Sequence, residues 1–373
     1  MLLYIYDKAL NQKGIYEDVI SFIWARRYWK CGDFKLLTRL TPNALQLFAA
    51  GNIIVPHGQD EAGVVEYIGI SKDEQGFEQL EVVGRFTSAY MGLRVIAGQY
   101  QAEQRTTSDI AADIITQNIT NPNDKNRTIK NIFLLDMVTE DGKVDYISEP
   151  YENVLAAVEN LCMNAKIGFK TVLSPILKRH VIQLYKGVER TAGTEYNCIF
   201  SKEYDNLIGA DYTFSNSNYA TCGWCLGAEI KPESEDEQPI TPVEFVEKEH
   251  RSGLDRIEVL LDGNDIKADE VPDITAALEA RGLSLLAGME VTESFDGEIN
   301  TRVSPLYKRD FDVGDRITVR DTALNITRDL RITETTETYE NGKNSLSLTF
   351  GESLPTKIKI TGAYKNGGKI KLF

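Results

Sequence analysis

Two cysteines have the spacing of a chemically active pair. The motif Cys222-Gly-Trp-Cys225 places two thiols three residues apart with a glycine between them, as in dithiol redox sites. Such sites begin a helix whose dipole lowers the thiol pKa, whereas Leu226 to Ile230 continues as strand or loop. A zinc site would need a second Cys or His pair, and Cys198 and His250 have no such partner close by. We therefore favour structural cysteines over a redox or metal role for this pair.

The three histidines belong to no motif with known chemistry. They are His57, His180 and His250. Their positions match neither a metalloprotease motif nor a catalytic triad. We expect them to serve at the surface or in packing, and we predict no metal site and no cofactor.

Pairs of carboxylates offer a further chemical interpretation, because sugar cleavage needs two carboxylates held a few ångströms apart. Asp141 with Asp145, and the run from Glu233 to Glu237, are such pairs. However, the chain has 56 Asp and Glu residues, so close pairs are expected without any catalytic role, and the 233–237 run lies on a predicted loop. Solvation is the expected role, and we predict no catalytic residue.

The composition indicates a globular chain built from several parts. A length of 373 residues exceeds what one core usually supports, so two to four subdomains are expected. The net charge of -15 disfavours a duplex-binding role that depends on a basic patch. It permits a passage through which nucleic acid slides without sticking, because like charge on a lumen wall suppresses adhesion.

The sequence has no feature of a secreted or membrane-inserted chain. The apolar start from Met1 meets a charge at Asp7 and has no basic segment before it, so it is too short for a secretory signal. No apolar run approaches the roughly 20 residues that span a bilayer. Five cysteines, an odd number spread over the chain, do not form a disulfide framework. We expect synthesis in a cytoplasm, reduced thiols and no membrane insertion.

The stretch from Tyr307 to Gly351 is predicted to form the sheet around which the other elements are arranged. Its strands show alternating apolar residues at Ile317, Val319, Leu346, Leu348 and Phe350. This period is typical of strands that bury one face. The pair Asn341-Gly342 supplies the positive φ angles of a tight hairpin turn. Gly314 before Asp315 is predicted to form a turn from which the next strand begins.

Four stretches carry helix signals. Thr41 followed by Pro42 is a cap followed by a proline at the first helical position. Ser108 is expected to cap a helix to Ile119, and a second helix is expected from Pro150. A fourth is predicted from Pro272 to Arg281, where Gly282 would supply the left-handed C-terminal residue.

Together these signals predict a β-rich α+β fold with β units near both ends and α/β inserts between them. The predicted parts are 1–95, a β module; 96–189, an α/β insert; 190–249, part of a second β module with an acidic loop at 231–242; 250–300, a small α/β insert; 301–352, the rest of the second module; and 353–373, a tail. The stretch Asp255 to Leu261, which contains Arg256, is predicted to be a strand.

The order of several short motifs resembles the siphophage and prophage tail-tip hub proteins. The motifs are Gly84-Arg85-Phe86, Leu93 to Ile96, Glu152 to Leu155, Ile167-Gly168-Phe169, Ser201 to Leu207, Asp255 to Glu258, Gly282-Leu283 and Tyr307 to Val319. This family is similar to the baseplate hubs of contractile tails and to the N-terminal hub of tail-associated lysins. The resemblance covers nearly the whole chain, and none of its motifs is catalytic.

The resemblance implies two tube-protein-like β-barrel modules and assembly as a homotrimer that forms a pseudo-sixfold ring around the tail channel. The implied partners are the tail tube, distal tail and tape-measure proteins, and receptor-binding or lytic tip proteins, with DNA passing through the channel without specific binding. The implied location is the virion tail or a phage-tail-like particle.

On this sequence the implied structural residues are Arg256 on a barrel strand, Tyr307 at the start of the closing sheet, and Gly314 with Asp315 at the strand entry. The predicted function is a non-enzymatic structural hub. The alternatives are a tail-associated cell-wall hydrolase or its anchoring domain and, less favoured, a dithiol protein that uses Cys222 and Cys225.

Overall fold

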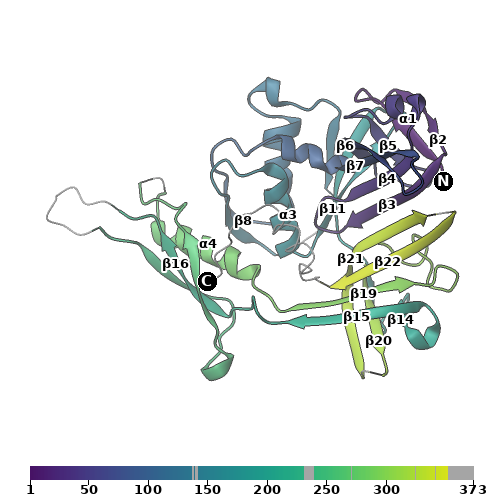
Figure 1. Ribbon diagram of the computed structural model, residues 1–373. Coiled ribbons are helices and arrows are strands. Elements are labelled where there is room, and N and C mark those ends of the chain that lie inside the picture. The colour runs from purple at the N-terminus through teal and green to yellow at the C-terminus, as the bar shows by residue number, and fades with distance from the viewer. Residues whose placement is uncertain are drawn as a thin grey trace.

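The computed structural model describes residues 1–136, 138, 142–230, 239–269, 271–323, 325–340 and 342–351. Most of the acidic segment 231–242, the turn residue Asn341, Asp141 and the tail 353–373 therefore lie outside the described residues. The described chain forms a β-rich α+β fold, which confirms the predicted class (Figure 1).

The N-terminal β unit contains seven strands, one short helix and a 3-10 helix. They are β1 (Leu3–Tyr6), β2 (Gln12–Tyr16), β3 (Val19–Arg27), β4 (Asp33–Arg39), α1 (Pro42–Leu47), β5 (Ile53–Pro56), β6 (Gly63–Lys72), β7 (Glu78–Phe86) and η1 (Thr87–Leu93). The hydroxyl of Thr41 accepts a hydrogen bond from the backbone N–H of Ala44 at 3.0 Å, and Pro42 follows in the first turn. The predicted cap of α1 is confirmed.

The α/β unit follows and packs on the N-terminal β unit. It contains β8 (Gln101–Arg105), α2 (Thr107–Ile115), β9 (Ile132–Asp136), β10 (Val144–Ile147), α3 (Val154–Asn164), β11 (Gly168–Ser174) and β12 (Arg179–Tyr185). Thr106, rather than Ser108, caps α2. Asn153 caps α3, which begins at Val154, four residues later than the predicted start at Pro150. Thr106 offers the same hydroxyl as Ser108, so residue type alone did not fix the start of α2.

The second β unit completes one large sheet with the first. Its strands are β13 (Glu189–Arg190), β14 (Ile199–Ser201), β15 (Leu207–Ser215), β19 (Thr292–Ile299), β20 (Arg316–Asp321), β21 (Ile326–Glu340) and β22 (Lys343–Gly351). Pairing of Glu340 with Lys343 confirms the predicted hairpin between β21 and β22, and Gly342 has a φ of +80°. Figure 1 shows β21 beside β3, and their antiparallel pairing joins the two β units.

The large sheet is open in the part of the chain that the structure describes. Its strand order is β15-β19-β22-β21-β3-β4-β7-β6-β5-β1-β2, with β20 paired to β21, β13 and β14 away from this path. The path ends at β15 on one side and at β2 on the other. The two β modules therefore share one continuous ladder instead of forming two separately closed barrels within this chain.

A small α/β unit is inserted between β15 and β19. It contains β16 (Cys222–Gly227), β17 (Val243–Glu247), β18 (Glu258–Gly263) and α4 (Ile274–Ala287). We predicted residues 190–249 as part of the second β module, but β16 and β17 pair with β18 in this small sheet. Alternation of apolar residues identifies a strand without identifying its partner, which is why the boundary was placed too late.

Helix α4 does not end where the glycine signal predicted. Gly282 lies inside α4, and Gly288 is the C-terminal cap. A Cβ at Gly282 would lie 2.8 Å from a methyl group of Val246, so the glycine permits close packing of the helix on β17. No helix in the described ranges is long and apolar enough to span a membrane.

Candidate functional site

A buried arginine joins the two β units. Arg26 lies near the end of β3 and is 1% exposed. Its Nε is 2.6 Å from Oε2 of Glu61, and its Nη1 is 2.6 Å from Oδ1 of Asp312. The same Nη1 donates a hydrogen bond of 2.7 Å to the hydroxyl of Tyr307. One guanidinium thus connects the N-terminal β unit with the loop that precedes β20.

The electrostatics of this junction depend on complete pairing. Burial lowers the pKa of Arg26, but attraction to Glu61 and Asp312 outweighs it and raises the pKa well above its ordinary range. Burial raises the pKa of Glu61, with the guanidinium of Arg26 opposing that shift. Burial also raises the pKa of Tyr307, so its hydroxyl remains protonated. This hydroxyl lies 3.0 Å from Oγ1 of Thr335. These paired charges form a network that holds the two β units together.

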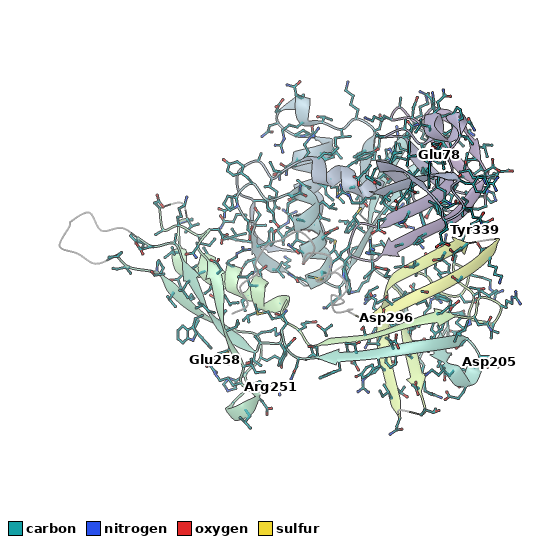
Figure 2. All side chains as sticks on the ribbon, in the orientation of Figure 1. Glu78, Asp205, Arg251, Glu258, Asp296 and Tyr339 are labelled. Carbon is teal, nitrogen blue, oxygen red and sulfur yellow. The ribbon has the colours of Figure 1, made fainter. Side chains whose placement is uncertain are left out.

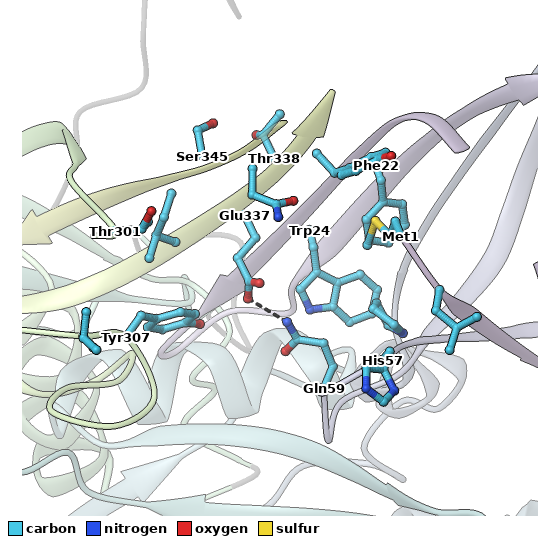
Figure 3. A pocket seen from close by; sticks show the side chains of 16 residues that line it. Met1, Phe22, Trp24, His57, Gln59, Thr301, Tyr307, Glu337, Thr338 and Ser345 are labelled. Carbon is cyan, nitrogen blue, oxygen red and sulfur yellow. Dashed lines mark hydrogen bonds between the residues drawn. The ribbon is translucent and has the colours of Figure 1, made fainter. Parts of the chain in front are cut away.

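A groove of about 650 Å³ opens next to this network, as Figure 3 shows. Tyr307, Trp24 and Glu337 line it, so both β units contribute to its wall. Nε2 of Gln59 donates to Oε1 of Glu337 at 2.7 Å across the junction. Lys308 also contacts Gln59. These polar contacts tie the loop around Gln59 to β21.

The turn at Gly314 and Asp315 lies directly before β20, at the predicted strand entry. Gly314 has a φ of +96° and donates its N–H to the carbonyl of Ile332 at 2.7 Å. A Cβ at Gly314 would lie 2.4 Å from a ring carbon of Tyr28. Both the backbone angle and the close contact therefore require glycine.

The carboxylate of Asp315 ties this turn to β13 and to the residue before it, which follow the α/β unit in the chain. It accepts a hydrogen bond from the N–H of Val188 at 2.8 Å and pairs with Nε of Arg190 at 2.8 Å. It also accepts from the N–H of Asp312 at 3.1 Å. Because Asp312 in turn binds Arg26, the turn and the buried arginine belong to one network.

Tyr28 is the point at which three units meet. Its backbone N–H donates to the carbonyl of Thr333 in the second β unit at 2.9 Å. Its carbonyl accepts from the N–H of Phe169 in the α/β unit at 3.0 Å, and its hydroxyl accepts from the N–H of Gly187 at 3.1 Å. The side chain and the backbone of one residue thus hold the units in register.

The structure brings three of the four predicted structural residues together and separates the fourth. Tyr307, Gly314 and Asp315 all contact the junction network. Arg256 lies on the small α/β unit, where it pairs with Glu258 at 2.6 Å and Glu247 at 3.2 Å. Figure 2 shows Glu258 on that unit, apart from Tyr339 on the large sheet.

The prediction that Arg256 lies on a barrel strand is therefore wrong. Arg256 caps a short 3-10 turn, Gly253–Asp255, and β18 begins only at Glu258. The alternation between Asp255 and Leu261 did identify β18, but a charged residue at its start belongs to the turn.

Sequence reasoning did not select Arg26, Glu61 or Asp312, and it considered Tyr28 only as a packing residue. One signal was available, since Arg26 directly follows the apolar run Phe22 to Ala25. A charge in such a place is nearly always paired. Its partners come from positions 35 and 286 residues away, and spacing could not reveal them.

The cysteine pair has the properties of structural residues. Cys222 and Cys225 lie on β16, and both are free and buried. Residues three apart on a strand point to opposite faces, so the two thiols do not face each other. Burial raises the pKa of Cys225 to about 11, which disfavours the reactive thiolate.

The histidines and carboxylates that the structure describes lie in separate places. His180 is buried, and burial lowers its pKa to about 4, whereas His250 is exposed and pairs with Glu247. Asp145 accepts a hydrogen bond from the N–H of Gln104, and its suggested partner Asp141 lies outside the described residues, as do residues 233–237. Within the described ranges, no group of three or more His, Cys, Asp and Glu side chains is arranged to hold a metal ion.

The fold is that of prophage tail proteins. A 43 kDa tail protein of prophage MuSo2 from Shewanella oneidensis is similar with a TM-score of 0.58 and 13% identity, over 94% of this chain and 98% of that chain. Prophage tail protein gp18 from Listeria monocytogenes has a TM-score of 0.56 and 11% identity over 98% of both chains. A tail protein from Neisseria meningitidis has a TM-score of 0.53 and 15% identity, over 94% of this chain and 96% of that chain.

The sequence of the chain also matches a family of phage tail proteins. The model of the Siphovirus ReqiPepy6 Gp37-like proteins matches residues 2–352, and the chain belongs to this family of phage tail proteins. No curated protein matches the chain. The predicted relationship to phage and prophage tail proteins is thereby confirmed.

The buried network makes a prediction about stability. Replacing Arg26 by alanine leaves the buried Glu61 without its cation and also removes the pair with the partly exposed Asp312, so we expect a loss of about 3–5 kcal/mol in the free energy of unfolding. Denaturant titration measures this change. The control is Arg85→Ala, which removes a half-exposed pair with Glu66 and should cost about 0–1 kcal/mol. Equal losses in the two variants would show that the Arg26 network is not the main tie.

A second prediction concerns Gly314. Gly314→Ala should destabilise the chain more than Gly76→Ala, although both glycines have positive φ angles, of +96° and +87°. Each alanine carries about 1–2 kcal/mol of backbone strain. Only the Cβ at position 314 meets another group, the ring of Tyr28, and overpacking adds about 1–3 kcal/mol. Thermal unfolding of the two variants compares them directly, and equal midpoints would argue against the tight contact.

Proposed function

We propose that this protein is a non-enzymatic structural hub of a phage tail or phage-tail-like particle, which joins the tail tube to the tail tip and forms a ring around the channel. The observation that carries the proposal is the run of eight strands β15-β19-β22-β21-β3-β4-β7-β6, in which every neighbouring pair is antiparallel. Membership of a phage tail family supports the location in a virion tail.

Both ends of this run present free strand edges. Strand β15 has β19 as its strand partner among the described strands. Strand β6 pairs with β5 only at Gly63 and Val64, so its remainder to Lys72 pairs with β7 alone in the described chain. Exposed, unpaired edges of this length are templates for pairing with another chain.

The direction of the strands fits closure into a ring. In a run of eight antiparallel strands the first and last point in opposite directions, so β6 of one copy would meet β15 of the next in antiparallel fashion. A closed cyclic assembly would then leave neither edge free. Apolar side chains lie along both edges, including Ile208 and Phe214 on β15 and Tyr67 and Ile70 on β6.

The two β units would allow a threefold ring to match a sixfold tube. Each contributes four strands to the run, β6, β7, β4 and β3 from the first and β21, β22, β19 and β15 from the second. We infer that these blocks are the two tube-protein-like modules, and that they close as parts of a ring. A homotrimer would then present six similar blocks, in keeping with the symmetry of a tail tube.

The proposed partners follow from this position. They are the tail tube, the distal tail and tape-measure proteins on one side, and receptor-binding or lytic tip proteins on the other. DNA would pass through the channel without specific binding, which agrees with the net charge of -15. The chain would be made in the bacterial cytoplasm and act in the virion tail without a cofactor.

Solution mass tests the ring. Light scattering of the purified chain should give three times the mass of 41.8 kDa, and negative-stain averages should show a threefold ring with a central opening. A monomer under conditions that also include the purified tube protein would contradict the proposal. Cell-wall zymography of the same sample should show no clearing, and clearing would instead favour a hydrolase.

Edge variants test the contact that closes the ring. Ile208→Lys and Phe214→Lys place charges on the exposed edge strand β15, and we expect the variant chain to fold but to remain monomeric. The matched control is Leu254→Lys, since Leu254 is fully exposed on the small unit away from both edges. A trimer in the edge variant, or a monomer in the control, would argue against pairing through β15.

A further inference from the structure

One face of the small α/β unit is covered and the other is not. Helix α4 lies on the face that holds Cys225, Val246 and Leu261, and these three side chains are buried. The register of the sheet places Phe245, Trp224 and Leu260 in one row across the opposite face. Neighbouring residues on a strand point to opposite faces, so this row points away from α4.

The opposite face is apolar at its centre. Trp224 is 46% exposed and Leu260 is 69% exposed, whereas the other two tryptophans, Trp24 and Trp29, are 1% and 8% exposed. The rings of Trp224 and Phe245 lie 5.0 Å apart. Val243, two residues from Phe245 on the same face, is 46% exposed. Adjoining exposed apolar side chains of this kind mark a contact surface.

The rim of this face carries an excess of negative charge. Glu247, Glu258 and Asp262 lie on it by register. Arg256 pairs with Glu247 and Glu258 and lies over the ring of Phe245 at 5.3 Å. Three carboxylates therefore face one guanidinium. A segment that alternates apolar and basic residues would match both the centre and the rim.

The sequence after Gly351 has this pattern. Residues 352–373 contain five lysines and one glutamate, and lysines alternate with apolar residues from Lys357 to Ile360 and from Lys369 to Leu372. A lysine side chain is long and flexible, so its ammonium group can reach a carboxylate at the rim while its apolar neighbours cover the centre.

The described chain also ends close to the small unit. Gly351 pairs with Ser294 near the start of β19. Five residues earlier in the chain, the carbonyl of Met289 accepts a hydrogen bond of 2.9 Å from Nζ of Lys248, directly after β17. A segment of 22 residues spans up to about 70 Å when extended, so it can reach any part of the small sheet.

We propose that the C-terminal segment 353–373 docks on the outer face of β16, β17 and β18 of its own chain. Its isoleucines and leucine cover Trp224, Leu260 and Val243, and its lysines pair with Glu247, Glu258 and Asp262. Docking removes an exposed aromatic surface from water, and charge complementarity selects the segment. This inference does not depend on the proposed hub function.

Tryptophan fluorescence tests the docking. In the full chain Trp224 should be shielded, and a chain that ends at Glu352 should show emission at longer wavelength and a higher Stern–Volmer constant for acrylamide. Trp24 and Trp29 are buried and contribute little to quenching, so the signal reports on Trp224. In the background of Trp224→Phe, truncation should leave quenching unchanged. Equal quenching of the full and truncated chains would overturn the proposal.

Charge reversal provides a second test in a chain of full length. K357E/K359E should raise the quenching of Trp224 towards that of the truncated chain, whereas K30E/K130E, a matched pair of exposed lysines elsewhere, should not. Dilution distinguishes the occupant. Shielding that does not depend on protein concentration supports docking within one chain, and shielding that is lost on dilution would assign the face to a second copy and overturn the proposal.

Discussion

The arrangement of the two β units depends on one buried charge. Arg26 is fully desolvated, and its three partners come from both β units: Glu61 from the first, and Tyr307 and Asp312 from the second. A buried guanidinium is tolerated only when its donors are used, so the loop before β20 must lie against β3 for the network to form. The pairing of β21 with β3 then extends the ladder across the junction.

The turn before β20 is constrained by close packing as well as by charge. A larger residue at position 314 would be strained because Tyr28 lies against Gly314, and Tyr28 in turn binds the α/β unit through Phe169 and Gly187. The constraint is geometric, since each contact fixes where a strand starts. Together these contacts fix the positions of β3 and β20 relative to the α/β unit.

Local patterns in the sequence predicted much of the fold and only part of the site. The cap at Thr41, the hairpin at Gly342 and the entry turn at Gly314 are local signals, and the structure has them where they were expected. Arg256 was assigned to the wrong unit because the partner of a strand is set by long-range packing. Arg26 was not selected because its partners are separated by up to 286 residues, a distance over which spacing carries no information.

The small α/β unit enters and leaves the large sheet at one point. Ser215, the last residue of β15, pairs with Thr292, the first residue of β19, so the inserted chain begins and ends on adjacent strands. It has a core of its own, formed mainly by residues of β16, β17, β18 and α4. The unit is therefore a module within the chain, and a change in its size would leave the pairing of β15 with β19 unaltered.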